Sequence, residues 1–183
     1  MRIGCDLDGV IIDHRGHQSL LLREIGFDIP RQELYKDKIK KLLTPGQYKE
    51  FQNKLYGEMS LRANAVLGAR KALLKLKADG HEVRIISRRN AGASFARQWL
   101  IEHGFSKVFS PDTIHFVKSD MGKEVLCQKL HVELYVDDLP GVLEILKTPA
   151  HKILLSHRPQ QHPAATFTTN NWPDIVGHIK TLG

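Results

Sequence analysis

The sequence has 183 residues, of which 42% are hydrophobic and 26% are charged. This composition is sufficient for a buried core and excludes an intrinsically disordered chain. Lysine and arginine number 27 against 20 acidic residues, so the formal net charge is +7 and suits an anionic substrate or partner. Cys5 and Cys127 are too few for a disulfide framework. No apolar stretch is long enough for a membrane span or a secretory signal, and we expect a cytoplasmic protein without a membrane partner.

Short apolar runs recur along the chain. Residues 2–5, 82–86, 134–136 and 152–155 are aliphatic or β-branched for the most part, and each run ends at a polar residue. Such runs are typical of buried parallel strands whose carboxyl ends open onto a site.

Helical periodicity lies between these runs, at residues 67–77, 93–103 and 123–131, and again after Trp172. Strands that alternate with helices predict an α/β fold with a doubly wound parallel sheet. Ligands bind such folds beyond the carboxyl ends of the strands.

Residues 14–64 interrupt this alternation, because they show helical stripes and no strand pattern. We interpret them as a small helical insertion, which leaves residues 1–13 and 65–183 as the α/β core. Residues 31–62 contain eight basic and four acidic side chains, a local excess of +4. We interpret His14, where the chain enters the insertion, as part of a polar hinge or as an anion contact.

Paired carboxylates follow two of the expected strands. Asp6 and Asp8 come directly after the first run, followed by Gly9, which lets the backbone turn sharply and approach a ligand. Asp137 and Asp138 follow the run at 134–136. Either pair alone is typical of an acidic turn or a helix cap. Together they predict a site for a divalent metal, since adjacent buried carboxylates repel each other and Mg²⁺ prefers oxygen ligands.

Residues that suit a phosphate accompany these pairs. Ser87 ends the second run, and Arg88 follows it at the expected start of a helix, where a hydroxyl and backbone N–H groups form a phosphate cradle. Lys118 and Lys123 both precede the second acidic pair, and Lys123 is favoured because it starts the helix that leads there. Arg15, at the entrance to the insertion, is a further candidate for substrate binding. A helix cap or a solvated surface residue is the alternative for each.

In chain order, Asp-x-Asp-Gly-Val at residues 6–10, Ser87, Lys123 and the acidic pair 137–138 resemble the four motifs of the haloacid dehalogenase-like (HAD) phosphohydrolases. The resemblance implies a Rossmann-like core with a small helical cap inserted after the first strand. The tail NNWPDIVGHI at 170–179 is also similar to the tails of small 5'-nucleotidases of this family.

The resemblance implies a role for each motif residue. Asp6 attacks phosphorus and forms an aspartyl-phosphate, while Asp8 protonates the leaving oxygen and later activates the hydrolytic water. Ser87 and Lys123 hold the phosphoryl oxygens.

The implied cofactor is Mg²⁺. Its ligands are the Asp6 side chain, the Asp8 backbone carbonyl and the Asp137 side chain, and Asp138 acts through water or as a supporting partner.

Three functions are compatible with these residues. The first is a Mg²⁺-dependent phosphatase that acts on a small phosphorylated metabolite. A nucleoside monophosphate is favoured because the insertion is basic and contains aromatic side chains that can stack a base, namely Tyr35, Tyr48, Phe51 and Tyr56. The second function acts on nucleic-acid ends, with the positive charge contacting the backbone. The third is a non-catalytic binding module, which the presence of the nucleophile Asp6 disfavours.

Overall fold

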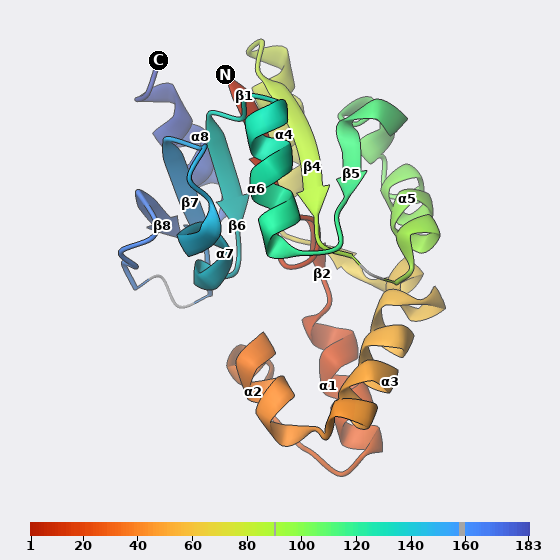
Figure 1. Cartoon of the computed structure of the whole chain (residues 1–183). Helices are drawn as coiled ribbons and strands as arrows, with labels where there is room; N and C mark the ends of the chain where they lie inside the picture. The colour runs from red at the N-terminus through yellow and green to blue at the C-terminus, as the bar shows by residue number, and fades with distance from the viewer. Residues whose placement is uncertain (90, 158–159) are drawn as a thin grey trace.

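A six-stranded parallel sheet forms the centre of the molecule (Figure 1). The computed structural model describes residues 1–89, 91–157 and 160–183. The strand order is β5-β4-β1-β6-β7-β8, and every neighbouring pair is parallel. The strands are β1 (Arg2–Cys5), β4 (Glu82–Ser87), β5 (Ile114–Phe116), β6 (Leu134–Asp137), β7 (His151–Leu155) and β8 (Phe167–Thr169).

Helices cover both faces of the sheet, which confirms the expected α/β architecture. The helices of the core are α4 (Ala69–Ala78), α5 (Ala93–Glu102), α6 (Asp120–Lys129), α7 (Pro140–Ile145) and α8 (Trp172–Lys180), with short 3-10 turns at Phe105–Lys107 and Pro111–Thr113. Side chains alternate along the strands, so Ile85 packs with α4, α5 and α8 while Ile86 packs with α6 and α7. This alternation produces two apolar layers, one on each face.

The insertion forms a third apolar cluster of its own. It contains α1 (Arg15–Glu24), α2 (Lys36–Leu42), α3 (Pro45–Tyr56) and 3-10 turns at Arg31–Glu33 and Glu58–Arg62. Leu22, Ile39, Phe51 and Leu55 are buried together at its centre. The chain leaves and re-enters the core through an antiparallel pair, β2 (Ile12–Asp13) and β3 (Asn64–Ala65). The insertion lies at one end of the sheet, and both termini lie at the other (Figure 1).

Local sequence explains where the longest insertion helix begins. The hydroxyl of Thr44 accepts a hydrogen bond from the N–H of Gln47, and the Gln47 side chain accepts one from the N–H of Thr44. Pro45 occupies the first helical position, where no intrahelical N–H is needed. This capping box fixes the start of α3 at Pro45.

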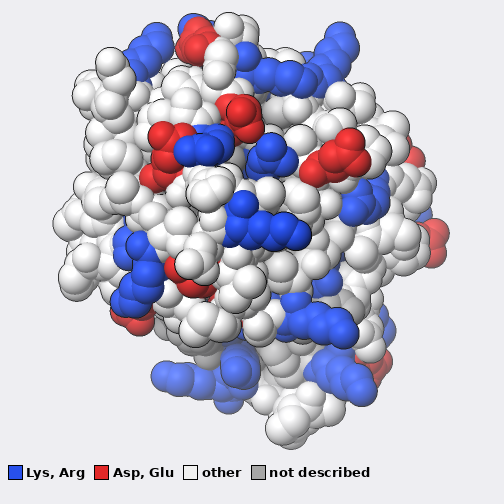
Figure 2. Space-filling view, turned by 45° about the horizontal axis from the view of Figure 1, so that its top comes forward, with Lys and Arg blue, Asp and Glu red and all other residues white. Residues whose placement is uncertain are grey.

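Surface charge is dispersed on the face shown in Figure 2, where lysine and arginine lie among acidic and uncharged side chains. The net charge of +7 is therefore not gathered into one patch on that face. Within the described ranges, no helix has the length and apolar character needed to cross a membrane.

Candidate active site

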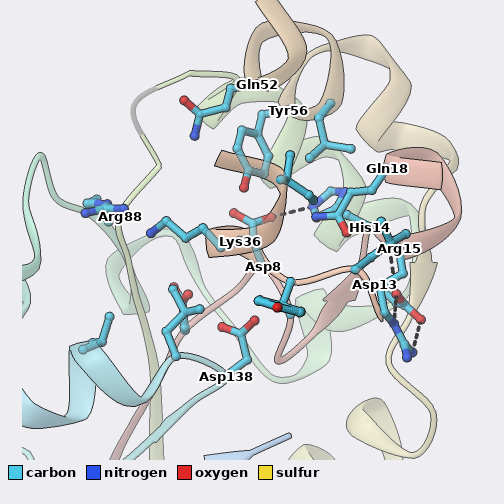
Figure 3. A pocket seen from close by; sticks show the side chains of 18 of the residues that line it. Asp8, Asp13, His14, Arg15, Gln18, Lys36, Gln52, Tyr56, Arg88 and Asp138 are labelled. Carbon is cyan, nitrogen blue, oxygen red and sulfur yellow. Dashed lines mark hydrogen bonds and ion pairs between the residues drawn. The ribbon is translucent and has the colours of Figure 1, made fainter. Parts of the chain in front are cut away.

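The carboxyl ends of β1, β4 and β6 open onto a cavity of about 710 Å³. Residues that follow these strands line one side of it, and residues of α1, α2 and α3 line the other. Figure 3 shows the labelled side chains that surround the space, including Asp8, His14, Lys36, Gln52, Tyr56, Arg88 and Asp138. The cavity is at the edge of the sheet where ligands are expected in this class of fold.

The first acidic pair sits on a tight turn after β1. The N–H of Asp6 donates to the carbonyl of Val136 at 2.9 Å, so the pairing of β1 with β6 continues to the site. Gly9 has a φ of +87°, a conformation that favours glycine. A Cβ atom at this position would overlap the carboxylate of Asp138. Glycine is therefore required both for the turn and for its close approach to the second acidic pair.

Lys123 is almost fully buried, with 1% of its surface exposed, and it lies between two carboxylates. Its Nζ atom donates to Asp137 Oδ2 at 2.8 Å and lies 3.2 Å from Asp6 Oδ1. Burial opposes the charged form, but the charges of Asp137 and Asp6 raise the pKa of Lys123 above its usual value. Lys118 is exposed and does not line the cavity. The structure brings Lys123 into the site and leaves Lys118 outside it.

Asp6, Asp137 and Asp138 form a carboxylate cluster in which one oxygen atom of each lies within 4.8 Å of the others. Burial and the charges of Asp137 and Asp6 raise the pKa of Asp138 well above its ordinary value. Burial also raises the pKa of Asp6 to about 6, although Lys123 opposes this. Asp138 Oδ1 is buried and has no hydrogen-bond partner among the described residues. Oxygen atoms in this situation fit a divalent cation.

The two residues of the second acidic pair are not equivalent. Asp137 Oδ2 accepts from Lys123, and its Oδ1 accepts from the N–H of Leu139 at 2.9 Å, so both oxygens already have protein donors. Asp138 lines the cavity, whereas Asp137 does not. The resemblance implies Asp137 as the direct metal ligand and Asp138 as the supporting residue, and of the two it is Asp138 that faces the cavity.

Asp8 is held by two basic side chains that were not assigned to it from the sequence. His14 Nε2 lies 2.6 Å from Asp8 Oδ1, and Arg89 donates to the same oxygen at 3.0 Å. Burial opposes ionisation, but the hydrogen bond from His14 and the charges of His14 and Arg89 outweigh it and lower the pKa of Asp8. Successive side chains of a strand point to opposite faces. Extending this alternation past the end of β4 would have predicted that Arg89, and not Arg88, lies on the same side as Ser87.

Arg89 also connects the core to the insertion. It donates to the carbonyl of Tyr56 at the end of α3 (3.0 Å) and to Ser60 Oγ (3.2 Å), and its guanidinium carbon lies 5.2 Å from the centre of the Tyr56 ring. A Cβ atom on nearby Gly92 would overlap the Tyr56 carbonyl. The end of α3 therefore rests directly on the loop after β4, and one arginine contacts both Asp8 and the insertion.

Ser87 is buried at the end of β4 and does not line the cavity. Its hydroxyl is close enough to Asp6 to favour the charged carboxylate. The helix expected directly after Ser87 is absent there, because α5 begins only at Ala93. The prediction that a helix starts directly after Ser87 is therefore wrong, and the phosphate contact of the Ser87 hydroxyl stays a prediction.

Arg88 and Arg15 both line the cavity, but each already has an acidic partner. The NH1 group of Arg88 donates to Asp120 at 2.6 Å. Arg15 forms a two-pronged ion pair with Asp13, with distances of 2.8 and 2.7 Å. The two arginines are thus held in place at the rim by neighbouring carboxylates.

No protein-family model matches this sequence, and no curated protein sequence matches it significantly. Solved structures do match. A haloacid dehalogenase-like protein of unknown function from Agrobacterium tumefaciens superposes with a TM-score of 0.71 at 17% identity, covering 98% of this chain and 97% of that one. A HAD family hydrolase from Deinococcus radiodurans, solved with phosphate and sodium, gives 0.68 at 14% identity and covers 98% and 95%. The chain has the haloacid dehalogenase-like fold. A predicted phosphoglycolate phosphatase from Haemophilus somnus with this HAD-like fold gives 0.67 at 16% identity and covers 97% of both chains.

Proposed function

We propose that this HAD-like chain is a metal-dependent phosphomonoesterase in which Asp6 is the nucleophile. The observation that supports this most directly is the position of Asp6, which lines the cavity 3.2 Å from the Lys123 ammonium and shares a carboxylate cluster with Asp138. A carboxylate between a fixed cation and a metal-binding cluster is suited to attack a phosphorus atom whose oxygens are neutralised from both sides.

The reaction proceeds in two displacements at phosphorus. An oxygen of Asp6 forms a bond to phosphorus, the ester P–O bond breaks, and the leaving oxygen takes a proton from Asp8. Asp8 then removes a proton from water, the water oxygen bonds to phosphorus, and the acyl phosphate on Asp6 is cleaved. This restores Asp6 and releases inorganic phosphate, and Lys123 stabilises the phosphoryl charge in both steps.

The second displacement returns to Asp8 the proton that it gave up in the first, but a resting Asp8 favours the ionised form because its two basic neighbours lower its pKa in spite of burial. A resting Asp8 must therefore gain a proton before the first turnover. His14 lies 2.6 Å away, within the range of direct proton transfer. Imidazole is the side chain best suited to pass protons at neutral pH. We assign to His14 the transfer of that proton to Asp8.

Mg²⁺ is the cation that we propose for the carboxylate cluster, because the available ligands are all oxygen atoms. The side chains of Asp6 and Asp138 and the backbone carbonyl of Asp8 would hold it, and Asp137 would position Lys123. When bound, the ion neutralises the phosphoryl oxygens and orients the substrate.

We propose further that the insertion, residues 14–64, acts as a cap that selects the leaving group. The preference for a nucleoside rests on four aromatic side chains, which have different surroundings. Phe51 is buried in the insertion and stacked with Tyr48, and Tyr56 packs against the core. All four residues line the cavity, but the side chain of Tyr35 is the exposed one. Tyr35 therefore has the ring surface most accessible for base stacking, and Tyr35→Ala tests it.

Phosphate release from a panel of esters tests the proposed function. The panel contains nucleoside monophosphates, sugar phosphates and a 5'-phosphorylated oligonucleotide, each assayed with Mg²⁺ and with EDTA. We expect release that requires Mg²⁺, disappears in Asp6→Asn and is fastest with a nucleoside monophosphate. Asp28→Asn is the matched control, because Asp28 is 80% exposed in the insertion.

Two outcomes would change the proposal. No release from any ester in Mg²⁺ would contradict the phosphatase and favour a binding module. If phosphate is released fastest from the oligonucleotide, the protein is instead a phosphatase that acts on nucleic-acid ends.

A further inference from the structure

Lys36, the first residue of α2, brings an uncompensated charge into the cavity. Its side chain is half-buried, lines the cavity and extends from the insertion toward Arg88 (Figure 3). Among the residues that the structure describes, none forms an ion pair or a hydrogen bond with Lys36. Burial and the nearby charge of Arg88 lower the pKa of Lys36. Half-buried charges are unfavourable unless they are paired, so a partner from outside the chain would relieve this position.

Arg88 approaches the same space from the loop after β4. Only its NH1 group is used by Asp120, at 2.6 Å, and a guanidinium has five N–H donors. Lys36 and Arg88 thus bring two positive charges to this end of the cavity, and Asp120 is hydrogen-bonded to Arg88. The attraction of Asp120 and Asp138 for Lys36 is smaller than the opposing effects of burial and Arg88.

From this arrangement we propose that Lys36 and Arg88 form a subsite for a second anionic group, a carboxylate or a second phosphate, on the leaving group of the substrate. The inference rests on the proposed function, since it places the transferred phosphoryl group at Asp6 and Lys123. The transferred phosphoryl group is placed beside Lys123 and the carboxylate cluster. Lys36 belongs instead to the insertion, which faces the leaving group. An ammonium beside a guanidinium fork matches the oxygen atoms of a carboxylate or a phosphate.

Two esters that differ in a single group provide the test. Glycerol 3-phosphate ends in CH₂OH, where 3-phosphoglycerate carries a carboxylate. We expect the wild-type protein to hydrolyse 3-phosphoglycerate with at least a tenfold higher kcat/KM. Lys36→Met removes the charge and retains the length, and it should reduce the ratio of the two kcat/KM values by about 10- to 100-fold. Lys36→Arg should restore most of the ratio.

Lys40→Met is the matched control, because Lys40 lies on the same helix, is exposed and does not line the cavity. It should leave the ratio within twofold of wild type. Adenosine 3',5'-bisphosphate and adenosine 5'-monophosphate differ in a 3'-phosphate, so the ratio of their kcat/KM values measures the preference for a second phosphate. Comparing this ratio with that of the first pair shows which anion is preferred.

The outcomes separate the subsite from the proposed function. An equal loss of kcat/KM for both esters in Lys36→Met would place Lys36 at the transferred phosphoryl group, and an unchanged kcat/KM for both would exclude any role. Either result leaves the ratio at its wild-type value and overturns the subsite. Calorimetric titration of 3-phosphoglycerate into the Mg²⁺-loaded protein provides a readout without turnover. If neither ester is hydrolysed but binding weakens more than tenfold in Lys36→Met, the subsite holds and the proposed function fails.

Discussion

Asp6 and Asp8 are two residues apart, but the structure predicts opposite effects on stability when each is replaced by asparagine. Burial raises the pKa of Asp6 from 3.8 to about 6, and repulsion from Asp137 adds to this effect while Lys123 opposes it. One pKa unit corresponds to about 1.4 kcal/mol, so the ionised Asp6 lowers the free energy of unfolding by about 3 kcal/mol at pH 7.5. Asp6→Asn removes that charge and should stabilise the metal-free protein by a similar amount.

The coupling between protonation and folding determines the pH range over which Asp6→Asn is more stable than wild type. The folded protein favours protonated Asp6, because the folded-state pKa lies above the unfolded value. Stability is therefore retained below about pH 4 and lost as the pH rises through about 6. The difference between Asp6→Asn and wild type should be near zero at pH 3 and should reach its full size above pH 7.

Asp8→Asn is the matched control with the opposite sign. His14 and Arg89 stabilise the charged form of Asp8 and lower its pKa in spite of its burial. The substitution leaves the buried Arg89 without its carboxylate partner, which typically costs about 3 kcal/mol. Asp8→Asn should therefore destabilise the protein at pH 7.5.

Urea unfolding followed by circular dichroism, between pH 3 and pH 8 in EDTA, measures these free energies. Adding Mg²⁺ should reduce the advantage of Asp6→Asn, because the wild type binds the ion more tightly. An Asp6→Asn variant that is less stable than wild type in EDTA at pH 7.5 would refute the reasoning.

Three further predictions concern single positions. Lys123→Met should lower kcat/KM by at least about 100-fold and Lys118→Met by less than twofold, measured with the preferred ester, because only Lys123 reaches the carboxylates. Gly9→Ala should abolish Mg²⁺-dependent turnover, since the added methyl group displaces the Asp138 carboxylate, whereas Gly16→Ala, with open space around it, should retain turnover. Asp13→Asn should lower the free energy of unfolding by about 1–2 kcal/mol at pH 7, as measured by urea unfolding. This difference should shrink as the pH falls from about 4 to about 2. The pKa of Asp13 is lowered to about 2 by its arginine partners in spite of partial burial, and those partners are themselves part-exposed.

Strands with continuous apolar runs could be predicted from the sequence, because burial on both faces requires apolar residues at every position. The runs at 2–5, 82–86, 134–136 and 152–155 correspond to β1, β4, β6 and β7. β5 and β8 were not predicted, since each has only three residues and offers no run to detect. Helices with an apolar stripe could be predicted for the same reason of burial, whereas the six-residue α7 is too short to show one.

The sequence alone determined which carboxylates meet. Parallel strands end at one edge of a sheet, so Asp6 and the pair at 137–138 had to converge once their strands were recognised. Which member of a pair faces the cavity was decided only by the tertiary structure, because it depends on the donors that surround each oxygen. Lys123 and the N–H of Leu139 donate to the two oxygens of Asp137, whereas Asp138 Oδ1 has no donor among the described residues.

Contacts between the core and the insertion were also decided by the tertiary structure. Arg89 contacts Asp8, 81 positions away along the chain, and the end of α3, and Lys36 extends from the insertion toward Arg88. Each is one of the 27 basic residues, with no local pattern to distinguish it. A periodic pattern records burial within one element, and it contains nothing about which residue of a distant element will lie opposite. That choice depends on how the insertion packs on the core, and here it determines both the partner of Asp8 and the charge at the far end of the cavity.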